Sequence, residues 1–347
     1  MDRAEAIRRV VATTSLPEAG EEFVVERFRE EDAGGVARLF VEVYGDTYPF
    51  DLYYRPGAIA EANARGDLSS VVARTPSGGI VAHGAFYRSA APNPGLLEVG
   101  QLIVPTSYRE TFAAFRVMQT LFEKVAPALG IEGVFGEAVC HILASQKVAH
   151  VSGMSAVGIE VDQMPAGSYE REGASGRVSC LLLSRTYRDA PGPLSVPAAC
   201  VDETELVLAD LGLSREVTIS TGPLPENHPS NVRVEAIPSA GVLRAWVSSA
   251  GFDLEERARE IDARADSDGL DVRQLYLSLH GPGTGAAVDI LRSEGWFFGG
   301  FLPLWFGSDA LFLQKVARPR FDGLKLFTPK ARRLLELVRA SWERTQT

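Results

Sequence analysis

Glu98-Val-Gly-Gln-Leu-Ile-Val-Pro105 is the stretch of sequence from which the fold of this chain can be worked out. Its apolar residues predict a strand over residues 96–104, which stops at the proline because proline has no N–H to donate to a neighbouring strand. A long helix is expected over residues 108–129. Phe112, Phe115 and Phe122 share one face of that helix, so we expect Phe112 in the core.

Strands and helices alternate on both sides of this junction. Before it we expect a strand at 22–29, helices at 32–44 and 57–64, and a hairpin of strands 68–74 and 80–88 closed by Thr75-Pro-Ser-Gly-Gly79. After it we expect a strand at 133–140, a helix at 143–151 and strands near 156–161 and 177–185. The helices are apolar on one face, which predicts that they pack on a sheet.

A proline-rich segment divides the chain. Pro191, Pro193 and Pro197 are too closely spaced for a regular element, so a domain boundary is expected within 189–199. The second half predicts helices at 202–211, after Asp253, at 284–291 and at 330–344, and strands at 232–237, 242–248, 272–279, 296–302 and 310–316. Its late elements repeat the order of the first half, which indicates a tandem duplication of topology.

Composition excludes several classes of protein. The 347 residues carry a net charge of −10, from 35 basic and 45 acidic side chains, so phosphate-driven nucleic-acid binding is not expected. Cys140, Cys180 and Cys200 have no CxxC spacing, which favours buried, reduced thiols. The five histidines lack metal-ligand spacing, so no metal is expected. Apolar runs fall short of the roughly 20 residues that cross a membrane, and no secretory signal is visible, so we expect a cytoplasmic protein.

The element order and the strand-proline-helix junction resemble the GNAT superfamily of acyl-CoA-dependent N-acyltransferases. Besides residues 98–105, the resemblance is carried by Tyr108-Arg109, by Ala144-Ser-Gln-Lys-Val-Ala149 leading to Gly153-Met154, and by Gly295-Trp-Phe-Phe-Gly-Gly-Phe-Leu-Pro303. It implies an α/β (α+β) fold with two GNAT-like mixed sheets flanked by helices. Residues 1–190 would form an acyltransferase domain, and residues 191–347 a second GNAT-like domain without its own CoA site.

The resemblance also implies a donor site, with acetyl-CoA or another acyl-pantetheine thioester as co-substrate. The family's phosphate-binding pattern, (Q/R)-x-x-G-x-(G/A), aligns with residues 109–114, where only Arg109 and Ala114 fit and Phe112 replaces a glycine. Ser107 and Glu110 have capping-box spacing, which places a carboxylate where a phosphate belongs. The donor-binding residues implied are Leu102, Ile103, Val104, Arg109 and Ala114.

Acyl transfer to an amine needs a base and an acid. The resemblance points to a carboxylate on the fourth or fifth strand as base, and Glu98 and Glu137 occupy such places, where an unpaired carboxylate is costly to bury. The alternative is that both face solvent or pair with an arginine. The family's usual acid, a tyrosine, falls at Ala149, so Ser145 is the candidate, with His141 and Tyr169 as alternatives.

A second motif lies in the other half. Gly281-x-Gly283-x-x-Ala286 fits a dinucleotide fingerprint, but residues 301–306 offer no acidic partner, so a flexible helix N-terminus is expected instead. Three functions remain open. The leading one is an N-acyltransferase acting on a small-molecule amine. The others are a catalytically degenerate protein that binds a ligand or partner, and an acyltransferase that takes its acyl group from an acyl carrier protein.

Overall fold

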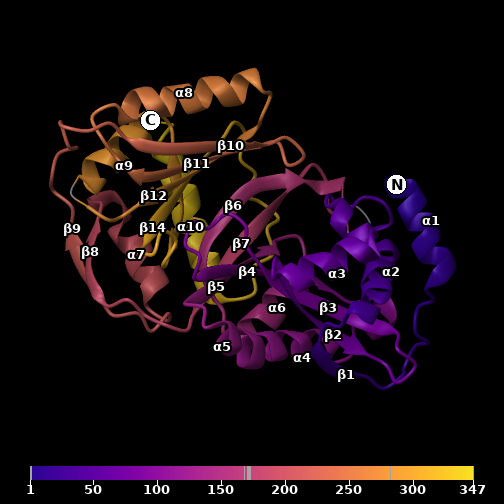
Figure 1. Cartoon of the computed structure of the whole chain (residues 1–347). Coiled ribbons are helices and arrows are strands. Elements are labelled where there is room, and N and C mark those ends of the chain that lie inside the picture. Colours follow the sequence, from indigo (N-terminus) through magenta and orange to yellow (C-terminus); the bar gives the residue numbers. More distant parts are fainter. Residues whose placement is uncertain (1, 168, 170–172, 282, 347) are drawn as a thin grey trace.

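The computed structural model describes residues 2–167, 169, 173–281 and 283–346, and within them the strands form one large mixed sheet (Figure 1). Its order is β1-β2-β3-β4-β5-β7-β6-β13-β14-β12-β11-β10, and β8 and β9 form a separate parallel pair. The strands are β1 (Val24–Arg27), β2 (Leu68–Arg74), β3 (Ile80–Tyr87), β4 (Leu96–Ile103), β5 (Gly133–Val139), β6 (Ser155–Pro165), β7 (Arg177–Thr186), β8 (Gly192–Val196), β9 (Arg215–Ile219), β10 (Asn231–Ile237), β11 (Val242–Ser249), β12 (Val272–Ser278), β13 (Phe297–Leu302) and β14 (Ala310–Val316).

Helices cover both faces of this sheet. They are α1 (Arg3–Thr13), α2 (Ala33–Tyr44), α3 (Pro56–Arg65), α4 (Ala113–Thr120), α5 (Ala126–Leu129), α6 (Ala144–Val151), α7 (Val201–Leu208), α8 (Leu254–Ser267), α9 (Thr284–Ser293) and α10 (Pro329–Glu343). Neighbouring residues on β2 show the layers, because Val71 packs into the core that contains α4 whereas Val72 packs into the core that contains α2 and α3. The expected α/β class is therefore confirmed.

The second half of the chain repeats the connectivity of the first. The order β3-β4-α4-β5-α6-β6-β7 recurs as β10-β11-α8-β12-α9-β13-β14, with a parallel pair, β4 with β5 and β11 with β12, at the same place in each. The two sets of strands join through β6 and β13, where Gly158 pairs with Gly300. A Cβ on Gly158 would lie 2.8 Å from the Gly299 carbonyl oxygen, so the two backbones meet too closely for a side chain.

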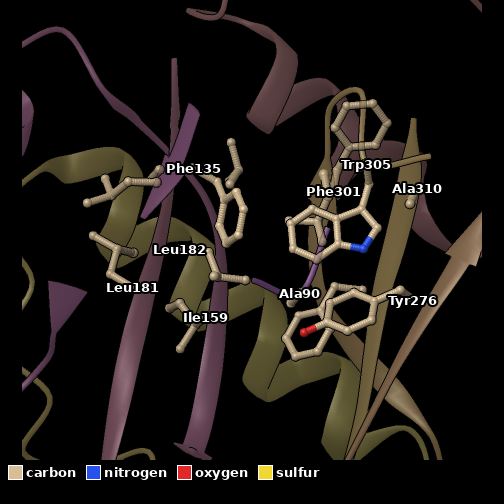
Figure 2. Packing of buried hydrophobic residues seen from close by; sticks show 14 of the residues in the cluster. Ala90, Phe135, Ile159, Leu181, Leu182, Tyr276, Phe301, Trp305 and Ala310 are labelled. Atoms are coloured by element: carbon tan, nitrogen blue, oxygen red, sulfur yellow. The ribbon is translucent and has the colours of Figure 1, made fainter. Parts of the chain in front are cut away.

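The joined sheet curls so that the two halves share one hydrophobic core. Phe135 on β5 lies edge-on to Trp305, with ring centroids 4.8 Å apart, and Trp305 stacks on Tyr276 of β12 (Figure 2). The Trp246 indole N–H donates to the Ala90 carbonyl oxygen at 2.8 Å. One buried cluster consequently runs from β2 in the first half to α10 in the second.

The entry to α4 differs from the sequence prediction. The residues Thr106–Tyr108 form a separate short turn, and α4 begins only at Ala113. Phe112 therefore lies before the helix and is 71% exposed, so the prediction that it belongs to the core is wrong. The predicted Ser107–Glu110 capping box is wrong for the same reason, because the Thr111 hydroxyl accepts the Ala113 N–H at 3.2 Å instead.

Three further elements, β8, β9 and α1, were not predicted. The proline-rich segment contains β8, which pairs in parallel with β9, so the expectation of no regular element is wrong. A two-strand sheet tolerates Pro193 because one side of each of its strands has no strand to donate to. The charged leader forms α1, whose N-terminus is capped by Asp2 accepting the Glu5 N–H at 2.7 Å.

Candidate functional site

Strands β4 and β5 diverge after a short paired stretch. Their parallel pairing runs from Leu96 with Gly133 to Glu98 with Phe135, although both strands continue well beyond it. The equivalent strands of the second half, β11 and β12, stay paired as far as Val247 with Leu277. The first half therefore has a divergence that the second half lacks, and Glu98 lies at its start.

A bulge in β4 lies beside this divergence. The β3–β4 register shifts between the pair Ala85 with Gly100 and the pair His83 with Ile103, and Gln101 adopts a positive φ of 52°. The His83 ring lies 3.1 Å from the Gln101 carbonyl oxygen and 3.0 Å from the Ser70 hydroxyl. Burial lowers the pKa of His83 to about 4, so a neutral imidazole holds the bulge at neutral pH.

Glu98 and Glu137 belong to one buried acidic cluster, together with Glu160 of β6. Burial, with the charge of Glu137 adding to it, raises the pKa of Glu98 to about 7, although the Ser89 and Tyr87 hydroxyls and Arg244 oppose the shift. The Tyr87 hydroxyl donates to the Glu98 carboxylate. Burial also raises the pKa values of Glu137 and Glu160.

An arginine from the second half faces this cluster. Arg244 Nη2 lies 3.8 Å from Glu137 Oε1 and 3.9 Å from Glu160 Oε1, and its Nε donates to Gln274 Oε1 at 2.7 Å. The side chains of Glu137 and Arg244 keep 16% and 12% of their surface exposed, whereas Glu160 keeps 1%. Glu137 thus has the arginine neighbour that the alternative interpretation foresaw, but at a distance longer than a direct hydrogen bond.

Tyrosines of α2 and the segment after it lie near Glu98. Burial raises the pKa values of Tyr48 and Tyr53, and the Glu98 carboxylate raises both further, so these phenols lie within its electrostatic reach. The Tyr48 and Tyr53 rings lie 5.5 Å apart, and Tyr44 lies 6.5 Å from Tyr169. Sequence analysis missed this wall, although the concentration of tyrosines in residues 44–54 was a visible signal.

The candidate donor residues lie around the end of β4 and the start of α4. Ile103 belongs to the buried cluster that contains the apolar face of α2. Leu102 packs near α4, and its Cδ1 would lie 3.5 Å from a Cβ added to Gly84. Arg109 Nε lies 3.5 Å from the Val104 carbonyl oxygen. Ala114 occupies the first turn of α4, whose N-cap residue is Phe112, so the N-cap side chain takes none of the N–H groups of that turn, and the Thr111 hydroxyl takes that of Ala113.

The candidate acids lie in two places. Ser145 is in the first turn of α6, which packs against α4, and its buried hydroxyl makes no hydrogen bond within the described part of the chain. His141 lies at the end of β5, where it lines a cavity of about 220 Å³. Its ring lies 5.3 Å from that of Tyr169. Ser145 is therefore on the α4 side of the sheet, whereas His141 and Tyr169 lie beyond the end of β5.

The corresponding helix starts of the second half are filled by the chain itself. A Cβ on Gly283 would lie 2.5 Å from the Pro223 carbonyl oxygen, and the Gly285 N–H donates to the Ser220 hydroxyl at 3.0 Å. Gly283 and Gly285 therefore make room for residues 220–223, which occupy this helix start. At α8, Asp253 accepts the Ser230 N–H at 2.6 Å, so this helix start is also occupied.

Comparison with known proteins finds likeness in structure only. No protein-family model matches the sequence, and no curated protein matches it. A ribosomal-protein-S5-alanine acetyltransferase from Vibrio fischeri is 12% identical with a TM-score of 0.40, over 50% of this chain and 97% of its own. An N-acetyltransferase from Staphylococcus aureus is 17% identical with a TM-score of 0.39, over 48% and 98%. A putative acetyltransferase from Salmonella typhimurium, solved with acetyl-CoA, is 11% identical with a TM-score of 0.41, over 50% and 98%.

The described residues also bear on two other classes of site. No helix there has both the length and the apolar character that a bilayer-spanning segment requires. The same residues contain no group of three or more His, Cys, Asp or Glu side chains placed to hold a metal ion.

Proposed function

We propose that this chain transfers an acyl group from a pantetheine thioester such as acetyl-CoA to the amine of a small molecule, with Glu98 as the general base. The observation that carries the proposal is the position of Glu98 at the start of the β4–β5 divergence, together with a pKa of about 7. A base with that pKa can take a proton from an ammonium group and still be ionised at neutral pH.

The two faces of the sheet suit two different substrates. Glu98 lies on the face of Tyr87, Tyr48 and Tyr53, where the aromatic wall and the excess of carboxylates favour a cationic amine. The start of α4 and Ser145 lie on the other face. Strands β4 and β5 separate between these faces, so an amine on one side can reach a thioester from the other.

The residues at the start of α4 fit a pyrophosphate better than the sequence suggested. The N-cap residue of α4, Phe112, offers no side-chain acceptor, and the Thr111 hydroxyl takes only the Ala113 N–H. Phe112 and Glu110 are exposed rather than built into the helix. Arg109, whose Nε lies 3.5 Å from the Val104 carbonyl oxygen, adds a positive charge between the end of β4 and the start of α4. These features support binding of acetyl-CoA through Leu102, Ile103, Val104, Arg109 and Ala114.

The chain's own groups would then perform three tasks. Glu98 accepts a proton from the bound ammonium, which leaves a neutral amine able to attack the acyl carbon. The bulge at Gln101, fixed by His83, holds the β4 backbone beside the reacting carbonyl group. The Ser145 hydroxyl gives a proton to the sulfur as the carbon–sulfur bond breaks, and takes one back from the attacking nitrogen, which loses its second proton as the amide forms. The donor supplies the activated acyl group.

The first prediction concerns Glu98→Gln. This change keeps the shape and the hydrogen bond to Tyr87 but removes the proton acceptor, so turnover should fall by about 10²- to 10⁴-fold. Acetyl-CoA affinity, measured by calorimetry, should change little because the donor binds on the other face. Turnover should be followed as free thiol released over a panel of small amines, with acetyl-CoA and acylated carrier protein as donors.

The matched control is Glu123→Gln, which changes an exposed residue between α4 and α5. This variant should behave as wild type. Full turnover in Glu98→Gln would mean that the base lies elsewhere. If wild type neither binds acetyl-CoA nor turns over any donor, the catalytically degenerate interpretation replaces this proposal.

A further inference from the structure

Arg244 occupies in the second half the position that Glu98 occupies in the first. Glu98 is the third residue of β4 paired with β5, opposite Phe135, and Arg244 is the third residue of β11 paired with β12, opposite Gln274. The strand pairings beyond these positions also correspond. In the first half, Glu137 pairs with Leu182, which pairs with Gly158. In the second half, Tyr276 pairs with Phe312, which pairs with Gly300. The two central glycines pair with each other, which relates the halves as a pseudo-twofold.

The two equivalent side chains face the same interior. The curl of the sheet brings β11 over β5 and β6. Arg244 therefore lies near Glu137 and Glu160, although β11 is far from β5 and β6 in the order of the strands. The second half therefore has no base at this position. It presents a positive charge to the acidic cluster of the first half.

The geometry of Arg244 differs from that of a structural ion pair in the same protein. Arg74 grips Asp32 with two hydrogen bonds of 2.7 and 2.6 Å. Arg244 makes its one direct side-chain bond, within the described residues, through Nε to Gln274, and Gln274 in turn donates to Glu160 at 2.9 Å. Its Nη groups stay partly exposed and beyond hydrogen-bonding distance of the carboxylates. Gln274 therefore holds the Arg244 side chain in place, and its positive charge acts on more than one carboxylate.

We infer that the second half completes the active site of the first, and that Arg244 is a positioning residue that acts on Glu98 through the charges of Glu137 and Glu160. The inference rests on the proposed function. Three carboxylates and one guanidinium share this interior within the described part of the chain, so Arg244 decides how many carboxylates ionise together. With it, Glu98 can release its proton near neutral pH. Without it, mutual repulsion keeps Glu98 protonated and unable to act as base.

The charged and titratable groups that face Glu98 come from several elements. They are Tyr87 of β3, Tyr48 and Tyr53 from the segment after α2, Glu137 of β5, Glu160 of β6, Cys180 of β7, Arg244 of β11 and Tyr276 of β12. The phenols and the thiol have pKa values raised by burial and stay neutral across the pH range of interest. Arg244 is consequently the group of this set whose positive charge opposes the carboxylates.

The test follows the Glu98 carboxyl group itself. The full-length protein, without substrate, is titrated while the infrared C=O band of protonated carboxyl groups is recorded. Wild type should show a carboxyl group titrating near pH 7 that disappears in Glu98→Gln. Arg244→Met should move that titration up by about one pH unit or more, and Arg244→Lys should stay close to wild type. Glu137→Gln should move it down, because the Glu137 charge raises the pKa of Glu98, and this tests the cluster with the arginine intact.

Arg233→Met is the matched control, since Arg233 lies on the adjacent strand β10 with its side chain 64% exposed. An unchanged Glu98 titration in a folded Arg244→Met protein, or in Glu137→Gln if the arginine variant does not fold, overturns the inference. The acid limb of the pH profile of kcat/KM should shift with the titration. A shift in the titration without any turnover in wild type would leave the electrostatic role of Arg244 standing and reject the proposed function alone.

Discussion

Glu98 makes the folded state sensitive to pH in one direction. Its ordinary pKa is 4.5, and in the folded protein burial and Glu137 raise it to about 7. The folded protein therefore binds this proton more tightly than the unfolded chain does. The contribution of Glu98 to the free energy of unfolding is therefore fully present below about pH 4.5 and is lost as the pH rises through about 7. Glu137 and Glu160 act in the same direction.

The prediction at this scale is that Glu98→Gln stabilises the protein at high pH. The amide cannot ionise, so the free energy of unfolding at pH 8.5 should exceed that of wild type by up to about 3 kcal/mol, with little difference at pH 5. Urea unfolding at both pH values measures it, and Glu123→Gln should show no pH-dependent gain. Equal stabilisation at both values would show that Glu98 does not titrate near 7.

Elements with strong hydrophobic periodicity lie where the sequence predicts them, whereas the start of α4 does not. The strand predicted over 96–104 is β4, and the helix predicted over 32–44 is α2, because alternation and a helical stripe report burial directly. The same stripe misplaced Phe112, since periodicity does not reveal where the chain turns before a helix starts. The bulge at Gln101 was equally invisible, because its register depends on β3.

The exposed position of Phe112 gives the prediction at the scale of elements. Phe112→Ala should change the free energy of unfolding by less than about 0.5 kcal/mol, as expected for an exposed side chain. Phe122→Ala, which changes a buried residue between α4 and α5, should lower the free energy of unfolding by about 3 to 5 kcal/mol. Denaturant titrations of both variants measure the difference. A large cost at Phe112 would return that residue to the core, as its spacing suggested.

At the scale of the whole molecule, the sequence indicated a repeated topology but not how the repeats meet. Glu98 and Glu137 were recognisable from their places on predicted strands. Glu160 and Arg244 were not, because their role depends on the curl that brings β11 over β5. That curl depends in turn on the close approach of β6 and β13, and Gly158 on β6 with Gly299 and Gly300 on β13 give no local pattern that marks a junction.

The last prediction tests that junction through Gly158→Ala. The new Cβ would lie 2.8 Å from the Gly299 carbonyl oxygen and 3.0 Å from the Gly300 Cα, and neither backbone atom can rotate away as a side chain could. The halves must therefore separate slightly, which should cost about 1 to 3 kcal/mol of stability. Because Arg244 reaches the acidic cluster across the same junction, the Glu98 titration should also move up. Gly192→Ala is the matched control, a strand glycine with open space around it. A Gly158→Ala protein with wild-type stability and an unshifted Glu98 titration would mean that the two halves are not fixed by this contact.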